Sequence, residues 1–357
     1  DGRYVAESND QLGIRANEVR VDAAQDSGSA VAAARAPDGV DVGVDEKRFE
    51  RRGAVIVVAG EVGERAGGRA IENSGLVAMD GTGGLLFGDG ASFNNQAGGN
   101  FDLRSDTGIS HAGGTKGSFA NSGTLRKSAG NGVSSITGIH FTNNSTVWAQ
   151  SGTLSFDDAV TNNGGTFQAS PGASISFNGN NARAFGANSR FVGGGAHAIN
   201  AGSNAFGGDF TAQNLTFSGG TLTGPATLHG SLAWTGGDWI SGSTFTVATD
   251  GVLTLDGPGA KRLYHGSAAS GGRVLANEGT IILKGTGQLQ LGDGAQLTIA
   301  RNATLDIRND STIGHTGSGN SGAVVNSGTI IKGTSNGTAT IAQPFTQTSD
   351  GKIVVNN

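Results

Sequence analysis

The chain repeats itself at long range. The segment 73–150 returns about two hundred residues later as 277–356. The two copies share glycines, strand residues and isolated polar residues in register, among them Gly88-Asp89-Gly90-Ala91 with Gly292-Asp293-Gly294-Ala295, and Asn121-Ser122-Gly123-Thr124 with Asn326-Ser327-Gly328-Thr329. Such self-similarity is typical of a solenoid, in which each unit buries its apolar face only against its neighbours.

Composition narrows the class of protein further. Glycine accounts for 64 of 357 residues and proline for 5, without a Gly-X-Y period, so the glycines serve turns and collagen is excluded. Hydrophobic residues make up 36% of the chain and come in short runs, none near the roughly 18 needed for a transmembrane segment. The net charge of -5 provides no basic surface for nucleic acid.

The chain contains no cysteine. Disulfides, cysteine-ligated metals and thiol nucleophiles are therefore all excluded. Together with the abundance of Gly, Asn, Ser and Thr, this composition is common in large secreted bacterial surface proteins, so we expect an extracellular or cell-surface location.

Charge divides the chain into two segments. Residues 1–70 hold 13 of the 29 acidic and 10 of the 24 basic residues. Strands are predicted there at Glu18–Asp22, Val40–Val44 and Ala54–Ala59. We expect a charge-rich capping or docking segment over 1–70, followed by a β-solenoid over 71–357 that contains the duplication.

From residue 71 onward, short apolar and polar alternations are separated by Gly, Asn, Ser and Asp. Gly152–Phe156 (GTLSF) and Ser243–Val247 (STFTV) are examples. Alternation with a period of two indicates half-buried strands, and the turns recur every 20 to 30 residues, too closely for helices to intervene. The sequence predicts an all-β protein, a right-handed parallel β-helix (β-solenoid) of roughly a dozen turns. A β-propeller or β-sandwich is the alternative.

Asparagines recur at matching places in the two copies. Asn73, Asn121, Asn277 and Asn326 each lie two residues before a glycine. We expect them to adopt the left-handed conformation at turns and to stack in ladders.

The repeats also resemble those of a known group of proteins. Asn121–Lys127 (NSGTLRK), Phe141–Asn144 (FTNN) and Gln150–Phe156 (QSGTLSF) resemble repeats of large secreted bacterial β-helix proteins of the adhesin, filamentous-haemagglutinin and autotransporter-passenger kind. The resemblance covers about 71–357. It implies a surface stalk, an adhesin or a matrix fibre.

The two ends of the chain suggest self-association. Ile353-Val354-Val355 aligns with Val147-Trp148-Ala149, after which the first copy continues into another strand. An uncovered final turn leaves backbone groups unpaired, so a second copy docking head-to-tail would generate a filament. The candidate self-association residues are Glu18, Val19, Arg20, Val21, Lys47, Arg48, Arg51, Arg52, Ile353, Val354 and Val355.

The sequence therefore favours an extracellular structural protein that stacks head-to-tail into a surface or matrix fibre, with itself as partner. The first alternative is a monomeric stalk or fragment of an adhesin that binds glycans or cells. The second is a β-helix polysaccharide lyase or hydrolase, for which the adjacent pair Asp157-Asp158 is a weak candidate because neighbours in a strand point to opposite faces. We expect no enzyme activity and no catalytic residue.

One polar segment stands out as a candidate ligand loop. Asp256–Gly266 (DGPGAKRLYHG) concentrates Lys261, Arg262, Tyr264 and His265. It suits an anionic sugar or an adhesion partner, or is simply an exposed loop. No calcium-binding repeat is present, so we expect neither metal nor cofactor. Trp148, Trp234, Trp239 and Tyr264 could form a sugar-stacking platform, but we expect the tryptophans to pack in the core or at corners.

Overall fold

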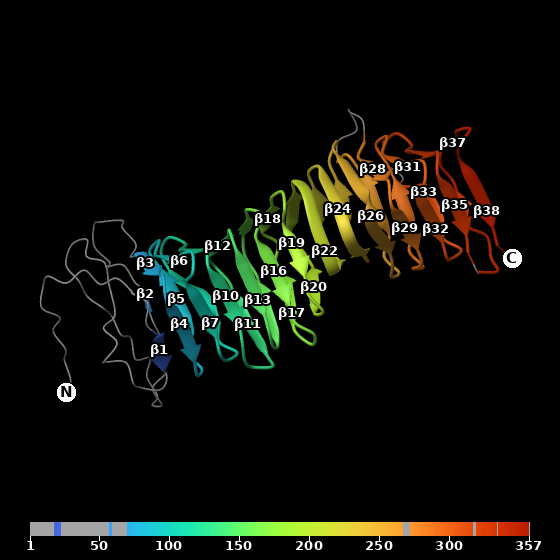
Figure 1. The fold of residues 1–357 in the computed structure, drawn as a ribbon. Coiled ribbons are helices and arrows are strands. Elements are labelled where there is room, and N and C mark those ends of the chain that lie inside the picture. Colours follow the sequence, from blue (N-terminus) through green and yellow to red (C-terminus); the bar gives the residue numbers. More distant parts are fainter. Residues whose placement is uncertain are drawn as a thin grey trace, which may run out of the picture.

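The computed structural model describes residues 18–22, 57–58, 70–266, 272–316, 319–333 and 335–356. Over these ranges the chain forms 38 strands and no helix. The strands wind around one long axis, so that the described chain is an elongated rod (Figure 1). Neighbouring strands pair in parallel across successive turns. The predicted parallel β-solenoid is confirmed, and its 13-stranded sheet corresponds to thirteen turns.

Each turn contributes to three faces, of which the third is the 13-stranded sheet. Its strands are β3 (Ala70–Asn73), β6 (Ser92–Asn95), β9 (Ser118–Asn121), β12 (His140–Asn143), β15 (Val160–Asn162), β18 (Ala182–Phe185), β21 (Ser203–Phe206), β23 (Thr221–Thr223), β25 (Asp238–Ile240), β27 (Lys261–Tyr264), β30 (Leu289–Leu291), β33 (Thr312–His315) and β36 (Thr340–Ile341).

The first and second faces are two columns of the 25-stranded sheet. The first face contains β1 (Glu18–Asp22), β4 (Leu76–Asp80), β7 (Asn100–Leu103), β10 (Thr124–Lys127), β13 (Thr146–Ala149), β16 (Thr166–Ala169), β19 (Arg190–Val192), β28 (Val274–Asn277), β31 (Gln296–Ile299), β34 (Ala323–Asn326) and β37 (Phe345–Gln347). The second contains β2 (Val57–Val58), β5 (Leu85–Gly88), β8 (Ile109–Gly113), β11 (Val133–Ile136), β14 (Thr153–Phe156), β17 (Ser174–Phe177), β20 (Ala196–Ile199), β29 (Thr280–Leu283), β32 (Thr304–Ile307), β35 (Thr329–Lys332) and β38 (Lys352–Val355).

Three long strands join these two columns in the middle of the rod. They are β22 (Gly208–Phe217), β24 (Ala226–Trp234) and β26 (Thr244–Leu255). Each runs across both faces without the corner that interrupts the chain in other turns.

The core is one continuous column of apolar side chains. Phenylalanine rings stack from turn to turn, as with Phe156 and Phe177, whose ring centroids lie 5.4 Å apart. In the middle of the rod Trp234 and Trp239 stack at 4.1 Å, and both are fully buried. The prediction that these two tryptophans pack in the core is confirmed. Stacking of like residues across turns gives each turn a matching surface for the next.

Asparagines form a ladder that includes the predicted Asn73 and Asn121, although not in the predicted backbone conformation, whereas Asn277 donates to the carbonyl oxygen of Thr304 and Asn326 to Gln347. Successive strands of the third face end in Asn73, Asn95, Asn121, Asn143 and Asn162. The Nδ2 of each of the first four donates to the Oδ1 of the next at 2.8 to 2.9 Å, and Asn162 Nδ2 donates to Ser189 Oγ at 2.7 Å. All five are buried. The expectation of a left-handed backbone conformation is wrong. These asparagines are the last residues of their strands, and their side-chain amides form the hydrogen bonds at the corner.

Left-handed positions fall elsewhere. Most are glycines, and the asparagines with positive φ are Asn188, Asn214 and Asn302. A corner that requires positive φ favours glycine because a Cβ there costs energy. Asparagine is tolerated at such positions because its short amide bonds locally.

The duplicated segments occupy different faces. Asn121 ends β9 on the third face, whereas its match Asn326 ends β34 on the first face. The sequence Asn-Ser-Gly-Thr thus turns the chain from the third to the first face in one copy and from the first to the second in the other. The two copies are related by a whole number of turns plus one third, since a strand with its corner fits any face that offers the same alternation.

Two of the predicted N-terminal strands fall on described residues. The first coincides with β1, which pairs in parallel with β4 from Glu18 opposite Leu76 onward. Within the predicted strand Ala54–Ala59 lies β2, which pairs with β5. The strand predicted at Val40–Val44 lies outside the described residues.

Candidate functional site

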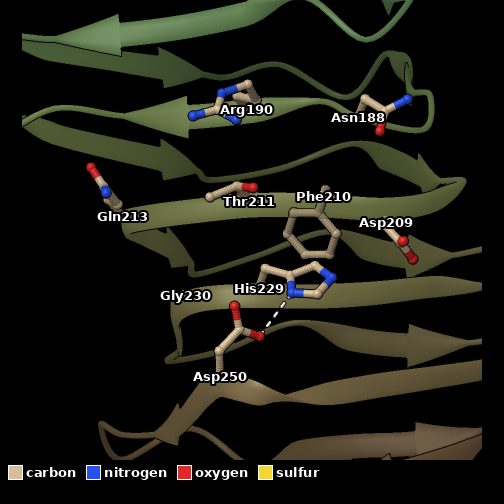
Figure 2. Close-up of a pocket in the computed structure, with 9 residues that line it drawn as sticks. All are labelled: Asn188, Arg190, Asp209, Phe210, Thr211, Gln213, His229, Gly230 and Asp250. Carbon is tan, nitrogen blue, oxygen red and sulfur yellow. Dashed lines mark hydrogen bonds and ion pairs between the residues drawn. The ribbon is translucent and has the colours of Figure 1, made fainter.

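A polar depression lies on the outer surface of the first face, in the middle of the rod. Its volume is about 500 Å³. It is lined by Asn188, Arg190, Asp209, Phe210, Thr211, Gln213, His229, Gly230 and Asp250 (Figure 2). We call this group the central depression.

Register brings the residues of the central depression together. Arg190 of β19 lies opposite Thr211 of β22, which lies opposite His229 of β24. Parallel strands lie about 4.8 Å apart, so these side chains form one outward column. Alternation turns Phe210 inward, where it is only 2% exposed.

Backbone irregularities shape the floor of the depression. The pairing of β22 with β24 shifts register between Ala212 and Leu215, and that of β24 with β26 shifts between Leu228 and Gly230. Asn188 and Asn214 adopt φ values of 65° and 54°. Bulges of this kind re-aim side chains and are frequent next to binding sites.

His229 and Asp250 form a fixed pair in the depression. The imidazole Nδ1 lies 2.7 Å from Asp250 Oδ1, as the dashed line in Figure 2 marks. The carboxylate therefore orients the ring within the depression.

Arg190 and Asp209 are charged side chains of the depression that have no ion-pair partner among the described residues. Both are exposed, and within the described ranges neither side chain forms a hydrogen bond or an ion pair. They lie on neighbouring strands, and Figure 2 shows Arg190 next to Thr211 and Asp209 farther along the strand of Thr211. A guanidinium and a carboxylate thus remain available to a ligand.

A buried histidine supports the bulge beneath the depression. Nε2 of His197 lies 3.1 Å from the carbonyl oxygen of Phe167, and Nδ1 lies 3.3 Å from that of Gln213. Burial lowers the pKa of His197, against the effect of both carbonyls. The residue connects β20 to the bulge of β22.

The depression was not predicted from the sequence. Its residues are single members of successive turns, spread over 188–250, and none belongs to a motif. The available signal was that this stretch lies between the two repeated segments, where a unique site stands out against the repeats.

The candidate ligand loop has a different structure from the one expected. Residues 261–264 form strand β27, so the prediction of one continuous loop over 256–266 is wrong. Lys261 points inward, is fully buried, and its Nζ donates to the carbonyl oxygen of Gly257 at 3.0 Å. Its ammonium group forms a hydrogen bond with the backbone of the corner, which explains how a lysine can occupy an inward strand position.

The outward residues of that strand are engaged with each other. Arg262 binds Asp238 through both Nε and Nη2 at 2.7 Å, and the Tyr264 hydroxyl donates to the same carboxylate at 3.2 Å. Burial and the neighbouring Asp238 raise the pKa of Tyr264. His265 follows the strand. Of the four candidates, Arg262 and Tyr264 share Asp238 as a hydrogen-bonding partner.

The candidate self-association residues are only partly described. Glu18, Val19, Arg20 and Val21 belong to β1. Ile353, Val354 and Val355 belong to β38 and are exposed. Lys47, Arg48, Arg51 and Arg52 lie outside the described residues.

The acidic pair Asp157-Asp158 lies in the corner between β14 and β15. Asp157 accepts a hydrogen bond from Ser155 Oγ at 2.5 Å, and Asp158 pairs with Lys116 at 2.7 Å. Burial acts to raise the pKa of Asp158, but hydrogen bonds from Lys116 and Ala159 hold it below its usual value. Both carboxylates are engaged in the corner.

No group of three or more His, Asp and Glu side chains is placed to hold a metal ion in the described part of the chain. None of the described segments is a helix long and apolar enough to cross a membrane.

Comparisons with known proteins gave no match. No protein-family model, no curated protein and no solved structure is similar to this chain at a significant level.

Proposed function

We propose that the chain is the structural rod of an extracellular fibre, in which copies stack head-to-tail by adding β-solenoid turns. The role is structural rather than catalytic. Support for an extracellular location comes from the absence of cysteine and the abundance of small polar residues.

The observation that carries the proposal is the constant cross-section of the rod, in which the strands of the first and second faces pair in parallel and in register from turn to turn up to β37 and β38. Ile353 lies opposite Ile330 in the register of the second face, yet it is 54% exposed where Ile330 is 3% exposed. Likewise Phe345 is 38% exposed opposite the fully buried Val324. These inward positions fit another turn of the same cross-section.

The opposite end of the rod carries strands in the same two columns. There β1 continues the first face and β2 the second, both by parallel pairing. A second copy could therefore place β1 beside β37 and β2 beside β38 without changing strand direction. Parallel pairing between edge strands favours association of this kind.

Sedimentation velocity and negative-stain electron microscopy test the proposal. We expect the chain to sediment as polymers and to form filaments one rod wide. Ile353→Lys should leave separate rods, because a charge would be buried at the junction. Val133→Lys is the matched control, since Val133 is 52% exposed on the same face but lies far from the edge.

Wild-type protein that stays as separate rods would contradict head-to-tail assembly, as would polymers that Ile353→Lys leaves intact.

The alternative function, an adhesin stalk, is favoured by a different observation, the central depression.

A further inference from the structure

The central depression lies in a part of the rod that neither repeat contains. The repeated segments are 73–150 and 277–356, whereas the depression is built from residues 188–250. Both register shifts of the long strands and two of the positive-φ asparagines fall here. Local irregularities of this kind cost free energy, and they concentrate where a site must be shaped.

The charges of the depression differ from those on the rest of the rod. Elsewhere, exposed arginines pair with carboxylates, as Arg262 does with Asp238, Arg301 with Asp350, and Arg308 with Asp306. In the depression, Arg190 and Asp209 are unpaired although their strands are adjacent.

The chemistry of the lining selects a class of ligand. Donors from Arg190 and Gln213 alternate with the acceptors Asp209 and Asp250, around the oriented ring of His229. A hydroxyl group both donates and accepts, so vicinal hydroxyls match such a lining. A polyanion would meet two carboxylates, which disfavours it.

Shape points to the same class. Apolar ligands would find no exposed ring here, because Phe210 is buried. The column from β19 through β22 and β24 to β26 spans three strand spacings, about 14 Å. That length suits several linked sugar units running along the rod.

We propose that the central depression binds a segment of a neutral, hydroxyl-rich polysaccharide that lies along the rod axis, with Arg190, Asp209 and His229 as its principal contacts. This site does not depend on head-to-tail assembly, because none of its residues lies in β37 or β38.

Affinity electrophoresis of the full chain tests the site. Native gels would contain hydroxyethylcellulose, galactomannan or dextran as neutral polysaccharides, and polygalacturonate or heparin as anionic ones. The double variant Arg190→Ala/Asp209→Ala removes one positive and one negative charge. Its matched control is Arg301→Ala/Asp350→Ala, which removes an exposed pair of the same charges elsewhere. Both keep the net charge and the edge strand β38.

We expect at least one neutral polysaccharide to retard the wild type and the control equally. Arg190→Ala/Asp209→Ala should weaken that retardation about tenfold or more, the loss expected for two charged hydrogen-bonding groups. Circular dichroism and melting should match between the two double variants, because the replaced residues are exposed.

Three results would overturn the proposal: no retardation by any neutral polysaccharide, retardation by the anionic polymers alone, or equal retardation of both double variants. Sedimentation of the same samples reads assembly separately, so failure of the site is distinguishable from failure of the fibre.

Discussion

Individual polar side chains stabilise this solenoid from inside its corners. The buried ladder of Asn73, Asn95, Asn121, Asn143 and Asn162 satisfies backbone carbonyls as well as the neighbouring amides, as when Asn121 Nδ2 also donates to the carbonyl oxygen of Thr146. A buried polar group without a partner costs more than a hydrogen bond gains, so one missing member affects the turns on both sides.

Asn121→Ala should therefore lower the free energy of unfolding by about 1–3 kcal/mol. It removes the side-chain acceptor of Asn95 Nδ2 and the side-chain donor of Asn143 Oδ1, which keep only their bonds to the backbone. The matched control is Asn144→Ala, at an exposed asparagine of the next turn, which should change stability by less than about 0.5 kcal/mol. Urea titration followed by circular dichroism measures both, and equal losses would contradict a stabilising ladder.

Buried cations have a comparable role at other corners. Lys127 Nζ donates to the carbonyl oxygens of Ser105 and Ala129 and to Asp106. The second copy repeats the pair as Lys332 with Asp310. Lys332 Nζ likewise donates to a corner carbonyl oxygen, that of Ser335.

His197 gives the protein a defined response to acid. Burial lowers its pKa in the folded state, while the unfolded chain titrates near the usual value of about 6.5. The unfolded chain therefore binds the proton more readily, and stability is lost as the pH falls below about 6.5. Melting temperatures at pH 7.5 and 5.5 should show a drop that His197→Gln removes and that His140→Gln, at an exposed position, retains.

Titration of Asp102 does not overlap the pH range in which His197 changes stability. Burial acts to raise the pKa of Asp102, but hydrogen bonds from Arg126, Ser128 and Arg104 together hold it below its ordinary value. Its contribution to stability is therefore lost only at more acidic pH, below about 4. A wild type that melts equally at pH 7.5 and 5.5 would contradict the role of His197.

At the scale of strands and corners, alternation predicted much of the structure. The run GTLSF predicted β14, and EVRVD coincides with β1. Short strands with one apolar face can be predicted from the sequence, because the face on which each side chain lies follows from its position in the strand. The concentration of polar residues at 256–266 predicts a loop, yet 261–264 form a strand because the inward Lys261 is satisfied by the carbonyl oxygen of Gly257.

Faces and sites, in contrast, depend on the lengths of corners. The number of residues in each corner decides which face the next strand joins. The sequence therefore predicts the duplication but not that the second copy is rotated by one face relative to the first. The central depression was hidden for the same reason. Arg190, Thr211 and His229 become neighbours only through the register of three successive turns.

At the scale of the whole molecule, stability should vary along the axis. Each turn contacts only its neighbours, so a solenoid behaves as a one-dimensional chain whose ends open first. The middle combines the longest strands, β22, β24 and β26, with the stacked Trp234 and Trp239. The last strands, β37 and β38, have exposed side chains throughout.

Hydrogen exchange measured by mass spectrometry should therefore show slow exchange in β24 and β26 and the fastest exchange among well-covered peptides in β37 and β38. Assembly adds a neighbour to the last turn, so protection of β38 should rise with protein concentration in the wild type and in Val133→Lys. In Ile353→Lys it should stay low at every concentration. Uniform protection along the rod would contradict the idea that each turn is stabilised only by its neighbours. A gradient of protection in which β38 does not respond to concentration would agree with that idea but would exclude the head-to-tail junction.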